Sequence, residues 1–377
     1  MTLIACTSNF KRPFLVGDLL ISSSQARESI QLPTNTININ EFLKPNNSYA
    51  VDLYQKIYIV NKNVCVALAG IVSEMTQFLK ELTIRCSYYE KIEEANIREF
   101  IEEYDFKNKF TNSAFFIMLM ANEETTISGK QFWYPLELWG SVKSEIFEEV
   151  YACGTGKDDF LYQASEDQKF EASTEKGNIL RAVASNIGFI AKILATERIS
   201  LNTINKNWGG GFETILFDGN SFIKLDQIAY VTNYSQFNEV GDIGIPIPQL
   251  ILYYEYYKEV LFISSIEIKS WQNQKDNGDS IILTSNNYSA NLFMAPRLDL
   301  EKGSMIELPP SFSFQTYRVA LGYTIISKSN GIFAPSYFSE GPEFNVIYED
   351  TKFIQLTLSK KRIDLIRKSA KEVYPKI

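Results

Sequence analysis

The order in which strand-like and helical patterns follow one another most constrains how this chain can fold. Apolar residues form two hairpin-like segments, residues 2–16 and 56–69, and the second ends at Gly70. Beyond Gly70 the apolar residues recur at helical spacing, at Met75, Phe78, Leu79 and Leu82. This change of period predicts an amphipathic helix that begins near Ser73 as its N-cap.

The alternation of strands and helices then repeats along the chain. The patterns predict a helix over 92–104, strands over 114–121 and 131–138, helices over 157–164 and 179–196, and strands over 212–217 and 221–225. Such an order favours strands gathered in two sheets with helices on the outside. The predicted fold class is therefore α+β, in layers.

The sequence pattern changes after Val231, where strand-like segments rich in aromatic residues dominate. Strands are expected over 249–257, 260–268, 280–284, 317–327, 344–348 and 352–358, and residues 270–280 read as a linker. A basic helix over 360–373 closes the chain. We therefore expect a domain over residues 1–270 and a small β-rich appendage over 275–377.

Composition narrows the classes of partner. The chain has 377 residues and a formal net charge of −8, with no basic stripe, so a nucleic-acid phosphate backbone would repel it. Its apolar stretches are too short to span a bilayer, and its first residues lack the charge order of a signal peptide. The expected location is cytoplasmic, with neither nucleic acid nor membrane as partner.

Cysteine and histidine usage limits the chemistry. The four cysteines show no ligand spacing, so we expect buried free thiols, no metal site and no cofactor. The chain contains no histidine, which excludes Ser-His-Asp and Cys-His mechanisms. A nucleophile here needs another base, such as a lysine or an α-amino group, whose reference pKa is about 8.

Several short segments follow one another in a distinctive order. Thr2-Leu3-Ile4-Ala5 opens the first strand, and Gly17-Asp18 closes the hairpin. Lys56 lies on a strand before a turn and an apolar strand that ends in Gly70, and Gly154-Thr155-Gly156 precedes a later helix. In this order the segments resemble the proteasome β-subunit family and its bacterial relatives, over residues 2–225.

The resemblance implies a fold and a catalytic group. The fold is the αββα sandwich of N-terminal-nucleophile (Ntn) hydrolases, two stacked antiparallel sheets flanked by helices, here with a C-terminal β-rich extension. Thr2 would be the nucleophile after removal of Met1, and Asp18 would orient Lys56. Either Lys56 or the α-amino group would take the hydroxyl proton, and the Gly70 N–H would donate to the oxyanion. Family members assemble into rings, so a homo-oligomer is expected.

Some positions depart from the family pattern or allow a simpler reading. The family has a supporting aspartate late in the domain, whereas residues 205–211 read Asn-Lys-Asn-Trp-Gly-Gly-Gly without an acid. Asn205 or Asn207 could hydrogen-bond there but could not supply charge. Thr155 is either a supporting residue or a helix N-cap.

Two functions remain open on the sequence. The first is a threonine-type Ntn amidohydrolase that acts on a peptide or other amide bond. The second is a non-catalytic relative that keeps the sandwich for assembly or ligand binding. The missing late acid and the fate of Met1 motivate the second reading.

Overall fold

The computed structural model describes most of the chain. The described residues are 2–9, 12–25, 30–35, 49–110, 114–121, 130–135, 138–144, 146–166, 179–236, 244–245, 247–300, 306–309, 319–327, 332–339, 344–349, 353–361, 363–364 and 367–368. Within them the fold is mixed α+β, with mostly antiparallel sheets and few helices, which confirms the α+β part of the prediction.

Two sheets of the first 225 residues face each other. The first has the order β12-β11-β2-β1-β10-β9, with bounds Phe222–Lys224, Phe212–Phe217, Arg12–Asp18, Leu3–Asn9, Glu149–Gly154 and Gly140–Val142. The second has the order β5-β6-β7-β8, with bounds Ile57–Asn61, Val64–Ala69, Phe115–Met120 and Lys130–Tyr134. Their pairings are antiparallel throughout. A short ribbon of β3 and β4 joins them in sequence, with bounds Leu20–Ser23 and Tyr49–Leu53.

A buried apolar cluster fills the space between these two sheets. Ile4 and Leu15 reach it from the first sheet, and Cys65 and Ile117 reach it from the second. Alternation along each strand sends the neighbouring side chains to the opposite faces. The four cysteines are buried and free, as predicted.

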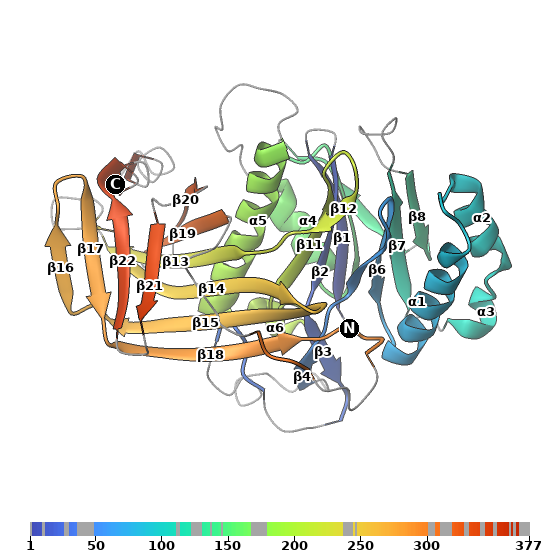
Figure 1. The fold of residues 1–377 in the computed structure, drawn as a ribbon, viewed down its shortest axis with the longest axis horizontal. Helices are drawn as coiled ribbons and strands as arrows, with labels where there is room; N and C mark the ends of the chain where they lie inside the picture. The colour runs from blue at the N-terminus through green and yellow to red at the C-terminus, as the bar shows by residue number, and fades with distance from the viewer. Residues whose placement is uncertain are drawn as a thin grey trace.

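Helices cover the outer faces of the two sheets (Figure 1). Helices α1 and α2, Val72–Ser87 and Glu94–Glu103, pack on the second sheet through a cluster that includes Phe78 and Phe116. Helices α4 and α5, Lys157–Ser165 and Ile179–Ser200, cover the first sheet. Two short helices, α3 over Phe106–Lys109 and α6 over Asn202–Asn205, also lie in this part of the chain.

The first helix does not begin as predicted. Its N-cap is Ile71, whose carbonyl accepts the first helical hydrogen bond from the Met75 N–H at 3.0 Å. Ser73 therefore lies inside the first turn, and its predicted role as N-cap is wrong.

The C-terminal strands form two further sheets. The larger has the order β18-β15-β14-β13-β19-β20, with bounds Asn287–Ala295, Val260–Ser270, Ile247–Tyr257, Ile228–Gln236, Val319–Ser327 and Ile332–Ser339. The smaller has the order β16-β17-β22-β21, with bounds Asn273–Asp276, Ser280–Ser285, Phe353–Ser359 and Phe344–Glu349. The larger sheet packs on α5 through one face and on the smaller sheet through the other.

Residues 270–280 differ from two sequence predictions. Residues 270–280 are not a linker, since β16 lies within them and pairs with β17. The expected division at 270–275 falls inside the larger sheet, because β15 before it pairs with β18 after it. Much of the polar segment 22–48 and of the helix predicted over 360–373 lies outside the described residues. No described helix is long and apolar enough to cross a membrane.

Candidate active site

The first hairpin brings Thr2 and Asp18 together. Strands β1 and β2 pair antiparallel with Ile4 opposite Gly17, so Asp18, the last residue of β2, lies opposite Leu3 and next to Thr2. The Asp18 Oδ1 accepts hydrogen bonds from the Leu3 N–H at 2.8 Å and from the Thr2 hydroxyl at 2.7 Å. The backbone register therefore aims the Thr2 hydroxyl at a carboxylate.

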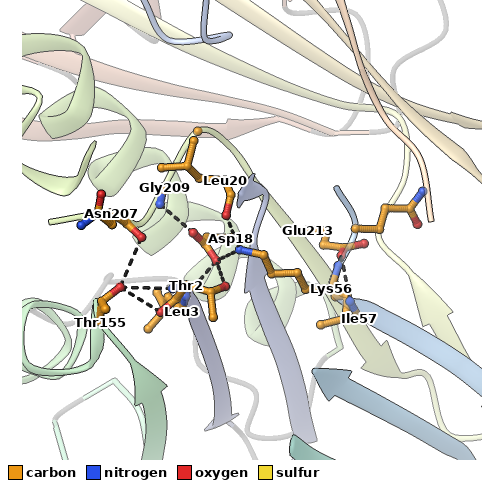
Figure 2. Close-up of polar contacts among 12 residues, drawn as sticks. Thr2, Leu3, Asp18, Leu20, Lys56, Ile57, Thr155, Asn207, Gly209 and Glu213 are labelled. Atoms are coloured by element: carbon orange, nitrogen blue, oxygen red, sulfur yellow. Dashed lines mark hydrogen bonds and ion pairs between the residues drawn. The ribbon is translucent and has the colours of Figure 1, made fainter. Parts of the chain in front are cut away.

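The Asp18 carboxylate is the centre of the site (Figure 2). Its Oδ1 also accepts from the Lys56 Nζ at 2.6 Å, and its Oδ2 accepts from the Gly209 N–H at 2.8 Å. Asp18 and Lys56 are fully buried. A buried carboxylate is tolerated when charge and hydrogen bonds are satisfied together, as they are here.

Lys56 immediately precedes β5, and its side chain runs to Asp18. The Nζ donates to the Leu20 carbonyl at 2.7 Å as well as to Asp18. Loss of solvation lowers the pKa of Lys56 from its ordinary value, while the Asp18 charge and hydrogen bond act in the opposite direction. The sequence prediction that Asp18 pairs with Lys56 is confirmed, and Asp18 also binds the Thr2 hydroxyl directly.

Thr155 lies on the other side of Thr2. The Thr2 N–H donates to the Thr155 Oγ1 at 3.1 Å, and the same oxygen is 3.3 Å from the Thr2 carbonyl and 3.2 Å from the Asn207 carbonyl. The N-cap of α4 is Gly156, so the reading of Thr155 as a helix N-cap is wrong. Gly154, at a φ of 101°, permits this approach, because an added Cβ would lie 2.0 Å from the Thr2 carbonyl oxygen.

The predicted supporting asparagines differ in their placement. Asn207, at a φ of 63°, contributes its main-chain carbonyl to Thr155. Asn205 ends α6, and its N–H donates to the Leu201 carbonyl at 2.9 Å. Gly70 follows β6 with a φ of 124°, a conformation that favours glycine. The oxyanion role of Gly70 stays a prediction.

The sequence reading missed a buried acid beneath the glycine segment. Glu197 of α5 accepts hydrogen bonds from the Thr34 hydroxyl at 2.5 Å, the Thr203 hydroxyl at 2.8 Å and the Gly210 N–H at 3.1 Å. Burial raises the pKa of Glu197 to about 7, against the lowering effect of these donors. An added Cβ on Gly209 would lie 2.0 Å from the Glu197 Oε2, so position 209 has no room for a larger residue beside this carboxylate.

A second missed acid, Glu213 of β11, lies beside the lysine. Its Oε1 accepts from the Lys56 N–H at 2.5 Å and from the Ile57 N–H at 2.9 Å. The sequence contained a signal for each of these two buried acids. Glu213 shares a strand face with the apolar Ile215, and Glu197 continues the apolar stripe of α5 three residues after Leu194.

Comparison with protein-family models finds no match to this chain, and comparison with curated proteins finds none either. The described Cys, Asp and Glu side chains include no group of three placed to hold a metal ion. The site is therefore interpreted from its own chemistry.

Proposed function

We propose that this protein is a threonine-type Ntn amidohydrolase in which Thr2, freed by removal of Met1, attacks a peptide or other amide carbonyl. The observation that carries the proposal is the convergence of the Thr2 hydroxyl and the Lys56 Nζ on one oxygen of the buried Asp18. A threonine hydroxyl is a weak nucleophile without a neighbouring base, and this arrangement supplies an amine in a chain without histidine.

The proposed chemistry uses two groups that both donate to Asp18. The Thr2 Oγ1 forms a bond to the carbonyl carbon while its proton passes to an amine, either Lys56 or the free α-amino group. The proton is then delivered to the leaving amine as the C–N bond breaks, which leaves an ester on Thr2. Water hydrolyses the ester, releases the acid and restores the hydroxyl. Where Lys56 is the base, it takes the proton as a neutral amine, and Asp18 then stabilises the ammonium that forms, since it accepts a hydrogen bond from the Lys56 Nζ.

The layer order supports the same proposal. Helices, sheet, sheet and helices follow one another across residues 3–224, and Thr2 lies at the start of a central strand of the first sheet. This is the arrangement expected of the Ntn sandwich. We further propose that Gly70 donates its N–H to the oxyanion and that copies of the chain assemble.

Covalent trapping tests the proposal. Intact-mass analysis of the protein from its own host would establish whether the chain starts at Thr2. A β-lactone probe should then acylate Thr2, and peptide mapping should find the added mass on the first residue. Thr2→Ala should remove labelling and Thr2→Ser should retain it, because serine keeps a hydroxyl. Labelling of Thr2→Ala at the wild-type rate would sink the idea.

One observation favours the second function, a non-catalytic binding or assembly protein. Thr2 keeps only 2% of its surface exposed. A cavity of about 290 Å³ lies elsewhere, between α1 and the segment that contains α2 and α3. This function predicts a chain that retains Met1 and gives no adduct with the probe, while the fold is unchanged.

A further inference from the structure

The main chain at Lys56 is held by one carboxylate with four donors. Glu213 is 2% exposed, and besides the Lys56 and Ile57 N–H groups it accepts from the Lys224 Nζ at 2.9 Å and the Tyr256 hydroxyl at 3.1 Å. Two consecutive N–H groups on one carboxylate oxygen fix the direction of the backbone there. The position of the lysine side chain follows from that direction.

Gln55, the residue before Lys56, is held as firmly. It is fully buried, and its Nε2 donates to the Glu259 carbonyl at 2.6 Å and to the Ala295 carbonyl at 2.8 Å. Its N–H donates to the Pro296 carbonyl at 3.0 Å, and its Oε1 accepts from Lys224. Apart from Lys224, these partners lie in the turn between β14 and β15, at the end of β18 or in the segment that follows β18.

The same segment reaches the next residues of β5. The Tyr58 hydroxyl donates to the Gln55 carbonyl at 2.5 Å and accepts from the Leu298 N–H at 3.2 Å. The guanidinium of Arg297 lies over the Tyr58 ring, 5.1 Å from its centre. Gln55 and Arg297 also form an isolated parallel bridge. Residues 295–298 therefore contact the segment between β4 and β5 that carries Lys56.

We propose that Glu213 and Gln55 are positioning residues, through which Tyr256 and residues 295–298 of the C-terminal region hold Lys56 against Asp18. The inference rests on the proposed function, because it assigns the C-terminal strands a part in keeping the catalytic lysine in place. Neither residue touches the reacting atoms. Their substitution should change how fast Thr2 reacts, not how well a ligand binds.

The test measures the two constants of covalent labelling separately. A β-lactone probe is applied to wild type, Glu213→Ala and Tyr256→Phe, and the maximal labelling rate is determined separately from the probe's half-saturating concentration. Glu213→Ala removes both carboxylate oxygens. A lysine displaced by about an ångström lowers the rate on the order of 100-fold, and we expect this for Glu213→Ala. Tyr256→Phe removes one hydrogen bond to a charged group and should lower the rate roughly 10-fold. The half-saturating concentration should stay the same in both.

Tyr257→Phe is the matched control. Tyr257 is the next residue of β14 and points to the opposite face, so the variant loses a hydroxyl from the same strand without touching Glu213. Its labelling rate should equal that of wild type. Equal rates in all variants, or an equal loss in Tyr257→Phe, would overturn the proposal.

Amide hydrogen exchange separates this inference from the proposed function. The Lys56 and Ile57 amides should be protected in wild type and exchange faster in Glu213→Ala, which lacks their acceptor, with no change in Tyr257→Phe. A wild-type chain that starts at Thr2 but gives no adduct would refute the proposed function and the catalytic purpose of the network with it. Unchanged exchange in Glu213→Ala would refute the positioning itself, whether or not Thr2 reacts.

Discussion

Replacing Glu197 by glutamine should remove a pH dependence from the stability of the fold. Burial raises the pKa of this carboxyl from its ordinary value of 4.5 to about 7. The folded state therefore retains a proton that the unfolded chain releases as the pH rises from 4.5. The associated stability is fully present below pH 4.5 and is lost as the pH rises through about 7. One pKa unit corresponds to about 1.4 kcal/mol, so the full loss is about 3 kcal/mol.

The neighbours of Glu197 make glutamine a fair replacement. Two of its partners are the hydroxyls of Thr34 and Thr203, and a hydroxyl can accept from an amide as well as donate to an oxygen. Glutamine can also keep an oxygen for the Gly210 N–H. The variant should therefore fold and lack only the titration.

Urea unfolding at several pH values measures this effect. Other groups titrate alike in wild type and variant, so the difference between their free energies of unfolding isolates Glu197. This difference should change by about 3 kcal/mol across the titration, most of it between about pH 5 and about pH 8, in favour of the variant at high pH. Glu90→Gln, at an exposed position, is the control and should follow wild type. Parallel profiles for wild type and Glu197→Gln would refute the reasoning.

Three further predictions concern the groups around Thr2. Nitrogen NMR of labelled lysine should find Lys56 titrating below its ordinary 10.5, because its ammonium is desolvated; a value at or above 10.5 would contradict this. Asp18→Ala leaves that buried ammonium unpaired and should lower the free energy of urea unfolding by about 3–5 kcal/mol, and a loss under about 1 kcal/mol would count against the buried pair. Gly154→Ala should cost at least about 1–3 kcal/mol from its backbone conformation alone, and calorimetry should find a lower melting temperature; an unchanged one would show that the Thr2 carbonyl can move away.

The sequence predicted those parts of the site that local order determines. Thr2 and Asp18 belong to one hairpin, so their meeting follows from a two-strand register. The resemblance to the proteasome β-subunit family implied Lys56, and Lys56 does reach Asp18. Those three residues could be named before any tertiary structure was known.

The missed residues depend on contacts between distant elements. Residues 205–211 contain no acid, yet Glu197 reaches that segment from a separate helix. Glu213 is an acidic position in the apolar run 212–217, and only the packing of the two sheets brings it to the Lys56 backbone. The domain boundary expected at 270–275 depended on the polar residues 270–280. Polar side chains do not prevent backbone pairing, and part of this segment pairs as β16 with β17.

The buried position of Gln55 has a consequence for the order of folding during synthesis. A growing chain emerges from its N-terminus, and early segments fold as soon as their partners exist. The Ala295 and Pro296 carbonyls that bind Gln55 emerge some 240 residues after it. Until then the Gln55 side-chain amide lacks these acceptors, and β5, which follows Gln55, is held by fewer contacts. The lysine of the site, made among the first sixty residues, therefore reaches its final place only after most of the chain has been translated.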